Sequence, residues 1–305
     1  MLSNRHRDRY QAAVYKWLSC AQQHGIRLHC PAPSRGARLL EGGHSHFHPE
    51  LFLQLGGATE FRFPHETIRL PAGEALLVPR KMPHAETAHH WRGTFRNLVI
   101  MFPRDGVTLH TGVRTPSGKP RSQDFEYFKT GKGHQIARYL DDIEALQAGA
   151  TQPESEEAMR SLLQAVLAYL RLVMVQDDED DNPKESAKVR ECRFFVISHL
   201  HDPHLSVKYL ASRLQCSADY LSHLFAVETG KRLTDFILQE RMAMAKQNLA
   251  NPTLSIKEIA WSCGFADPGY FTRLFKRVTG LPPRTFRQGR NACNVNSFER
   301  ITNSM

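Results

Sequence analysis

The side chains in this sequence best suited to chemistry lie in one short histidine-rich segment. GGHSHFHPELF, residues 42–52, places His44, His46, His48 and Glu50 at every second position. Side chains alternate between the two faces of a β-strand, so a strand here would direct all four groups to one side. Imidazole and carboxylate groups are ligands for divalent transition metals. The spacing therefore predicts a metal or ligand site, whose role depends on the rest of the chain.

The sequence around the histidines has the pattern of a small all-β unit. From Ile26 to about Arg104, short apolar segments such as LFLQL, EFRFP and FRNLVIMF are separated by Gly and Pro, which favours a sandwich or barrel. An amphipathic helix is expected before it, over residues 5–25. The segment VRTPSGKPRSQD, residues 113–124, is expected to be a loop after it.

Two helices are predicted next, over residues 134–148 and 154–176. In the second helix, apolar residues recur at three- and four-residue steps: Met159, Leu162, Leu163, Val166, Leu167, Leu170 and Met174. A stripe of this kind needs a partner, which is either the β unit or a second copy of the chain. Five consecutive acids and Pro183 then predict an exposed linker over residues 176–188.

Length and composition indicate a globular protein with more than one domain. A chain of 305 residues with 41% hydrophobic residues has room for two cores. The longest apolar run, residues 162–175, contains Gln164 and Arg171 and is too short to span a bilayer. The first residues are basic and polar without a secretory signal pattern, and the six cysteines show no CxxC spacing. We therefore expect a cytoplasmic protein that does not bind membranes.

The C-terminal third is strongly basic. Residues 184–290 hold 17 Lys and Arg against 9 Asp and Glu, so most of the net charge of +9 lies there. A compact basic domain favours a polyanionic partner such as nucleic acid.

This basic region contains a duplicated pattern. LSVKYLASRLQCSADYLSHLFAVETG starts at Leu205, and LSIKEIAWSCGFADPGYFTRLFKRVTG starts at Leu254. Each copy predicts two short helices, with N-caps at Ser206 and Ser217 in the first and at Ser255 and Asp267 in the second. Ser255 with Glu258 forms a capping box, and Gly230 and Gly280 end the second helix of each pair. Gly264 suits the sharp turn of the second copy, where Cys216 occupies that region in the first.

Paired short helices with a polar outer face on the second helix are typical of a helix-turn-helix, whose second helix enters the major groove. Between the copies, a helix capped by Thr234 and running to about Ala250 is expected. Its ~24 Å length, with the widths of the units, would separate the two reading helices by ~34 Å, one turn of B-DNA.

Residues 189–288 resemble the DNA-binding domain of AraC/XylS-type bacterial transcription regulators. The most specific parts are IKEIAWSCGFADPGYFTRLFKRVTGLPPRTFR and YLSHLF…ETG. The resemblance implies sequence-specific promoter binding by Asp219, Ser222, His223, Gly269, Thr272 and Arg273, with Lys276 as a phosphate contact. Family members often carry Arg where His223 stands and Lys where Ala226 and Val227 stand. The second unit is therefore expected to supply more of the affinity.

The β unit is similar to a cupin barrel. His44-x-His46-x3-Glu50 followed by Gly57 matches the first cupin motif, and Gly73-x5-Pro79 followed by His84 matches the second. This resemblance implies the ligand set of metal-dependent cupins, His44, His46, Glu50 and His84, with Fe, Zn, Mn or Ni as candidate metals. Lys81 and Ala88 replace the Gly and Asn usual there. In AraC-type regulators such a domain binds a small effector, so the same residues are candidate effector contacts.

The sequence as a whole predicts an α+β multidomain regulator that binds double-stranded promoter DNA and a small-molecule effector. Its predicted parts are an N-terminal helix and cupin-like barrel (1–110), a loop and connector helices (111–175), an acidic linker (176–188), a tandem helix-turn-helix domain (189–290) and a tail (291–305). A homodimer, and RNA polymerase as the partner of an activator, are further expectations. The alternatives are a dioxygenase-like cupin enzyme fused to a DNA-binding domain, and a metal sensor whose four ligands form the effector site.

Overall fold

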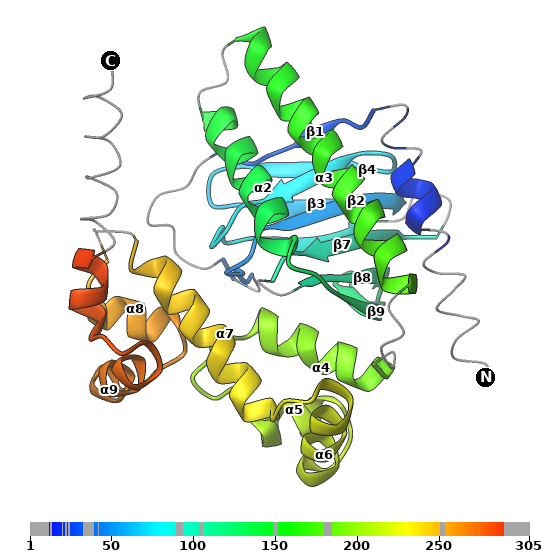
Figure 1. Cartoon of the computed structure of the whole chain (residues 1–305). Helices are drawn as coiled ribbons and strands as arrows, with labels where there is room; N and C mark the ends of the chain where they lie inside the picture. Colours follow the sequence, from blue (N-terminus) through cyan, green and yellow to red (C-terminus); the bar gives the residue numbers. More distant parts are fainter. Residues whose placement is uncertain are drawn as a thin grey trace, which may run out of the picture. The chain divides into compact units, whose positions relative to one another are not determined.

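The structure is a computed structural model that describes residues 12, 14–19, 21, 23, 25–32, 40–41, 43–89, 94–103, 106–148, 152–179, 185–250 and 254–289 (Figure 1). Its contacts divide the chain into two compact units, Met1–Arg190 and Glu191–Met305. The tail predicted at 291–305 lies outside the described residues.

The strands of the first unit form two separate sheets. In the six-stranded sheet the order is β1 (Leu28–His29), β5 (Ala75–Val78), β2 (Glu50–Gly56), β7 (Arg96–Met101), β8 (Gly106–Arg114) and β9 (Pro120–Lys129). β1 is parallel to β5, and the other neighbours are antiparallel. The three-stranded antiparallel sheet has the order β4 (Thr67–Pro71), β3 (Ala58–Arg62), β6 (Ala85–His89). The predicted β unit is present, but its described strands do not pair into a closed barrel, because no strand of one sheet pairs with a strand of the other.

The six-stranded sheet has a core on each face. On one face lie α2 (Gly133–Ala148) and α3 (Pro153–Glu179), which agree with the two predicted helices (Figure 1). Alternation along β2 directs Leu51 and Leu53 into the core that includes these helices, and Phe52 into a second core. That second core joins the two sheets and contains Phe61, Phe63 and Leu70 of the smaller one.

The apolar stripe of α3 packs in the helix-facing core. Leu163, Val166, Leu167 and Leu170 are buried with the sheet residues there. Residues 153–175 are long and apolar enough to span a membrane. Helices packed in a protein core meet the same criterion of length and composition, so this is weak evidence for a membrane span. Packing on the β unit, one of the two partners expected for this stripe, accounts for its buried residues.

The loop predicted over residues 113–124 is confirmed only for residues 115–119, which form the turn between β8 and β9, and is wrong for the residues on either side, which pair in the β8–β9 hairpin. The Gly118 backbone has φ +82° in the turn between the strands. Val107, Leu109 and Phe128 of the hairpin are buried in the helix-facing core. The apolar residues that hold the hairpin in the sheet lie outside the polar, Pro- and Gly-rich stretch that suggested a loop.

The described part of the second unit consists of helices, the first of which begins four residues before the boundary at Glu191. They are α4 (Ala187–Ser198), α5 (Val207–Arg213), α6 (Ala218–Thr229), α7 (Leu233–Asn248), α8 (Ile256–Ser262) and α9 (Pro268–Thr279), and residues 283–289 are also helical. α5 packs on α6 and α8 packs on α9, while α7 contacts α6 and α8. The two predicted helix pairs and the helix between them are confirmed.

The helix ends follow the sequence with two exceptions. Ser206, Ser217, Ser255 and Asp267 cap their helices as predicted, and the capping box of Ser255 is formed. The cap predicted at Thr234 is wrong, because α7 begins at Leu233, two residues before the start that this cap would give. Its N-cap is Arg232, whose side chain makes no capping bond. The acidic segment is helical as far as Glu179.

Candidate nucleic-acid interface and buried histidine site

In both helix pairs, the turn between the two helices contains a residue with a left-handed backbone conformation. Gly264, between α8 and α9, has φ +77°, and Gln215, between α5 and α6, has φ +52°. Gln215 precedes Gly264 by the same offset that separates the caps Ser206 and Ser255. The first turn therefore uses Gln215, and not Cys216, at the position of the glycine. Its left-handed conformation costs a non-glycine residue about 1–2 kcal/mol.

The turn at Gly264 is closely packed as well as left-handed. A Cβ at this position would lie 2.3 Å from the Leu200 carbonyl oxygen and 2.7 Å from Nη2 of Arg241. The Arg241 guanidinium is itself fixed, because it donates to the carbonyl oxygens of Leu200 (3.1 Å) and Asp202 (2.6 Å). The angle between α8 and α9 therefore depends on a glycine that fits against this arginine.

The residues predicted to read DNA lie on α6 and α9. On α6, Asp219 and His223 are exposed, while the Ser222 hydroxyl donates to the Ala218 carbonyl oxygen at 2.8 Å. The opposite face of this helix buries Leu221 and Phe225. The exposed residues are available to a partner molecule.

α9 repeats this arrangement with more positive charge. Gly269, Arg273 and Lys276 are exposed, and the Thr272 hydroxyl donates to the Pro268 carbonyl oxygen at 2.9 Å, as Ser222 does to Ala218. The Arg273 side chain is 74% exposed and its Nη2 lies 3.9 Å from Asp267 Oδ2. So exposed an ion pair is weak. The Arg273 guanidinium is therefore free to leave Asp267 for a stronger acceptor.

Two exposed tyrosines were not singled out by the pattern. Tyr220 and Tyr270 stand at equivalent positions, three residues after the N-caps Ser217 and Asp267, with exposures of 50% and 48%. The signal available in the sequence was their equivalence in the two copies. They are further candidates for contacts beside the reading residues.

The histidine segment is not the strand that the alternation predicted. β2 begins only at Glu50, and before it His44 makes a single β-bridge to His84. In this bridge each of the two residues donates its backbone N–H to the other's carbonyl oxygen, at 2.8 and 2.9 Å. Ring nitrogens of His44, His46 and His84 lie within 4.8 Å of one another, and His48 is not part of this group. Residues from the two predicted cupin motifs therefore meet.

Two carboxylates complete the cluster. Glu50 Oε1 lies 3.5 Å from His46 Nε2, and Glu50 Oε2 lies 3.6 Å from His84 Nε2. Glu86 Oε1 lies 3.7 Å from His44 Nε2 and 3.9 Å from His84 Nε2. Glu86 was missed in the sequence, although it follows His84 by two residues and therefore shares its face of the strand.

Burial shifts the pKa values of three members of this cluster, His84, Glu50 and Glu86. It lowers the pKa of the His84 imidazole to about 4 and, together with the Glu86 charge, raises the pKa of Glu50 well above its usual value. Burial also raises the pKa of Glu86 to about 7, opposed by Lys119. The rings of Phe52, Phe61 and Phe63 lie 6.3–6.5 Å from the His84 ring and form an apolar wall between the sheets.

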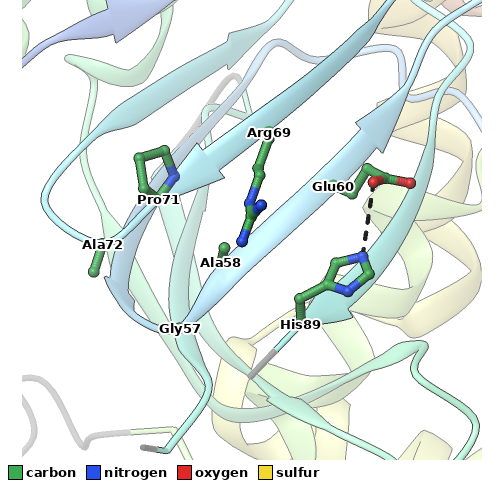
Figure 2. A pocket seen from close by; sticks show the side chains of 7 residues that line it. All are labelled: Gly57, Ala58, Glu60, Arg69, Pro71, Ala72 and His89. Carbon is green, nitrogen blue, oxygen red and sulfur yellow. Dashed lines mark ion pairs between the residues drawn. The ribbon is translucent and has the colours of Figure 1, made fainter. Parts of the chain in front are cut away.

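A pocket separate from the histidine cluster lies on the outer face of the three-stranded sheet. This pocket of about 440 Å³ is lined by Gly57, Ala58, Glu60, Arg69, Pro71, Ala72 and His89 (Figure 2). Glu60 and His89 form an ion pair across it, with 3.8 Å between Oε2 and Nε2 and with both side chains at least 40% exposed. His89 points away from the cluster, because its side chain is on the other face of β6 from Glu86. The histidine cluster and this open pocket are therefore distinct features.

Comparisons with known proteins connect the chain to DNA-binding regulators. A family model described as a helix-turn-helix domain matches residues 210–289. The transcriptional activator RhaR of Cronobacter sakazakii is 36% identical over 250 residues, which cover 80% of this chain and 86% of that protein. The arabinose operon regulatory protein of Escherichia coli is 26% identical over 228 residues, covering 74% and 73%. Among solved structures, the C-terminal domain of AraT from Geobacillus stearothermophilus matches 35% of this chain and 88% of its own, at 29% identity and a TM-score of 0.34.

Proposed function

Because this chain belongs to the AraC family of DNA-binding transcription regulators, we propose that α6 and α9 each enter the major groove of one promoter. The observation that carries this proposal is the pair of helix-turn-helix units, each with a buried apolar face and an exposed polar face on its second helix. A helix in the major groove reads bases with side chains on its exposed face. The two units would then read two consecutive groove segments, about one helical turn apart.

The second helix-turn-helix, α8 with α9, makes the stronger contacts to DNA in this proposal. Arg273 suits a bidentate contact to a guanine edge, worth about 1–3 kcal/mol of discrimination, and Lys276 suits a phosphate contact. α6 contains no Lys or Arg. Its Asp219, Ser222 and His223 therefore read bases while contributing little to phosphate neutralisation.

The remaining parts of the proposal concern control. We propose that the N-terminal unit, with its two facing sheets, is a cupin-like sensor of a small ligand, and that the protein works as a homodimer in the cytoplasm. Leu172 and Val175 of α3 are each 43% exposed and offer an apolar face to a second copy. The RhaR relative is an activator, which supports activation through RNA polymerase. The relatives are transcription regulators, so the chain is a regulator and not a cupin enzyme.

The test is DNA binding by the full chain at several salt concentrations. Neutralising about six phosphates would give a slope of about −5 for log K against log salt, with a sequence-specific duplex retaining its advantage over random competitor. Absence of duplex binding at low salt, or equal affinity for all duplexes, would contradict the proposal.

A further inference from the structure

We propose that His44, His46 and His84, together with Glu50 and Glu86, bind one divalent first-row transition-metal ion, and that this ion is the ligand to which the regulator responds. The binding site stands on the geometry of the cluster. The regulatory half rests on the proposed function.

The clearest sign is that hydrogen-bond acceptors face one another around His84. Its Nδ1 lies 3.0 Å from the Met82 carbonyl oxygen, which only accepts, so Nδ1 carries the proton. The Nε2 lone pair of this fully buried ring then faces Glu50 Oε2 at 3.6 Å and Glu86 Oε1 at 3.9 Å. Among the described residues, neither His84 Nε2 nor Glu50 Oε2 has a hydrogen-bond partner. A cation between these atoms would satisfy both.

The donor set specifies the kind of cation. As metal ligands, which must be deprotonated, three neutral imidazoles and two ionised carboxylates would carry a charge of −2, which a divalent ion balances inside an apolar site. Nitrogen-rich sets favour Zn, Fe, Co, Ni or Cu, whereas Mg and Ca prefer sets of oxygen ligands. The His84 Nδ1–H bond to a backbone carbonyl is the outer-shell contact that orients metal-binding histidines.

The cluster needs only a small closure to bind the ion. Its nitrogens lie within 4.8 Å of one another, whereas bonds of 2.0–2.1 Å in a tetrahedral zinc site separate neighbouring ligand nitrogens by about 3.4 Å. The His44 backbone is bridged to His84 and the His46 carbonyl oxygen accepts from the Lys81 N–H, so the closure would come from rotation of the two histidine side chains. The His44 side chain is 34% exposed and those of the other four are 13% or less, so the ion would enter beside His44.

The binding test uses the full chain freed of metal with a chelator and titrated with Co²⁺, followed by its visible spectrum, and with Zn²⁺ in competition. We expect one equivalent to bind, with affinity reduced at least about tenfold in His44→Ala and in Glu86→Gln. His89→Ala removes a histidine from the other face of β6 and is the matched control, expected to bind as wild type. No stoichiometric binding by wild type, or equal affinity in all four proteins, would overturn the site.

A measurement without variants protects the test against misfolding. X-ray absorption of the zinc-loaded wild-type chain should show imidazole and carboxylate ligands and no sulfur ligand. A sulfur-bound ion would overturn the proposal, because the cluster contains no cysteine.

The regulatory half is tested by DNA affinity with and without Zn²⁺. We expect at least about a fivefold change in the wild-type chain and none in His44→Ala. Metal binding without this change would overturn the regulatory half alone. Failure to bind DNA in either state would contradict the proposed function, whatever the metal titration shows.

Discussion

Replacing Gly264 by alanine should destabilise the second helix-turn-helix, and by more than the same replacement at Gly230 destabilises the first. The added Cβ would lie 2.3 Å from the Leu200 carbonyl oxygen, well inside contact distance. Left-handed backbone costs alanine about 1–2 kcal/mol, and overpacking costs about 1–3 kcal/mol. Together these give a loss of about 2–5 kcal/mol in the free energy of unfolding of the second unit.

The matched control separates these two contributions. Gly230 has φ +68°, close to that of Gly264, but a Cβ added there would meet no atom within 4 Å. Gly230→Ala should therefore cost only the conformational part, about 1–2 kcal/mol.

The assay is urea unfolding of the full chain followed by tryptophan fluorescence. Replacing Trp17 and Trp91 by Phe leaves Trp261 of α8 as the reporter of the second unit. A Gly264→Ala variant no less stable than Gly230→Ala would refute the close packing around this turn.

Three further predictions concern a cap, a DNA contact and a buried histidine. Ser255→Ala should lower stability by about 0.5–2 kcal/mol, and more than Ser206→Ala, which lacks the capping box; equal losses in urea unfolding would contradict this. Arg273→Ala should cost about 1–3 kcal/mol in specific binding and relax the preference at one base pair; in gel shifts Arg62→Ala, on β3, is the control, and equal effects would place Arg273 off the DNA. Burial lowers the pKa of His110 from 6.5 to about 3, so unfolding, which frees the ring to take a proton, becomes easier as pH falls from 6.5 toward 3, by up to about 1.4 kcal/mol per pH unit. His110→Leu should flatten that dependence in unfolding curves at pH 5 and 7, and an unchanged slope would exclude His110 as its source.

The DNA-binding unit was largely predictable because its signals are local. The caps Ser206, Ser255 and Asp267 act within one helical turn, and Gly280 ends α9 through its own left-handed backbone. The start of α7 was misplaced because Thr234 resembles a cap, whereas the chain already becomes helical after Arg232.

The N-terminal unit was less predictable because its geometry depends on pairing between distant strands. Alternation alone placed His48 beside His46. In the structure the β-bridge of His44 to His84 brings the two motifs together, and the group consists of His44, His46 and His84 without His48. Glu86 could have been placed beside His84 from their two-residue spacing, but the sequence does not show that this strand, β6, pairs with β3 in the smaller sheet.

One departure from the cupin motif has a structural counterpart. Lys81 stands where glycine is usual, and its backbone is left-handed, with φ +61°. Its N–H donates to the His46 carbonyl oxygen at 2.6 Å. The turn conformation is thus formed without glycine, and it supports the backbone of a cluster residue.

If α6 and α9 read one DNA site together, the full chain should select a characteristic sequence from a random pool of duplexes, which is the most direct measurement of their joint action. We expect the enriched sequences to contain two conserved blocks with centres about 10–10.5 base pairs apart. A single block, or no enrichment over the starting pool, would contradict it.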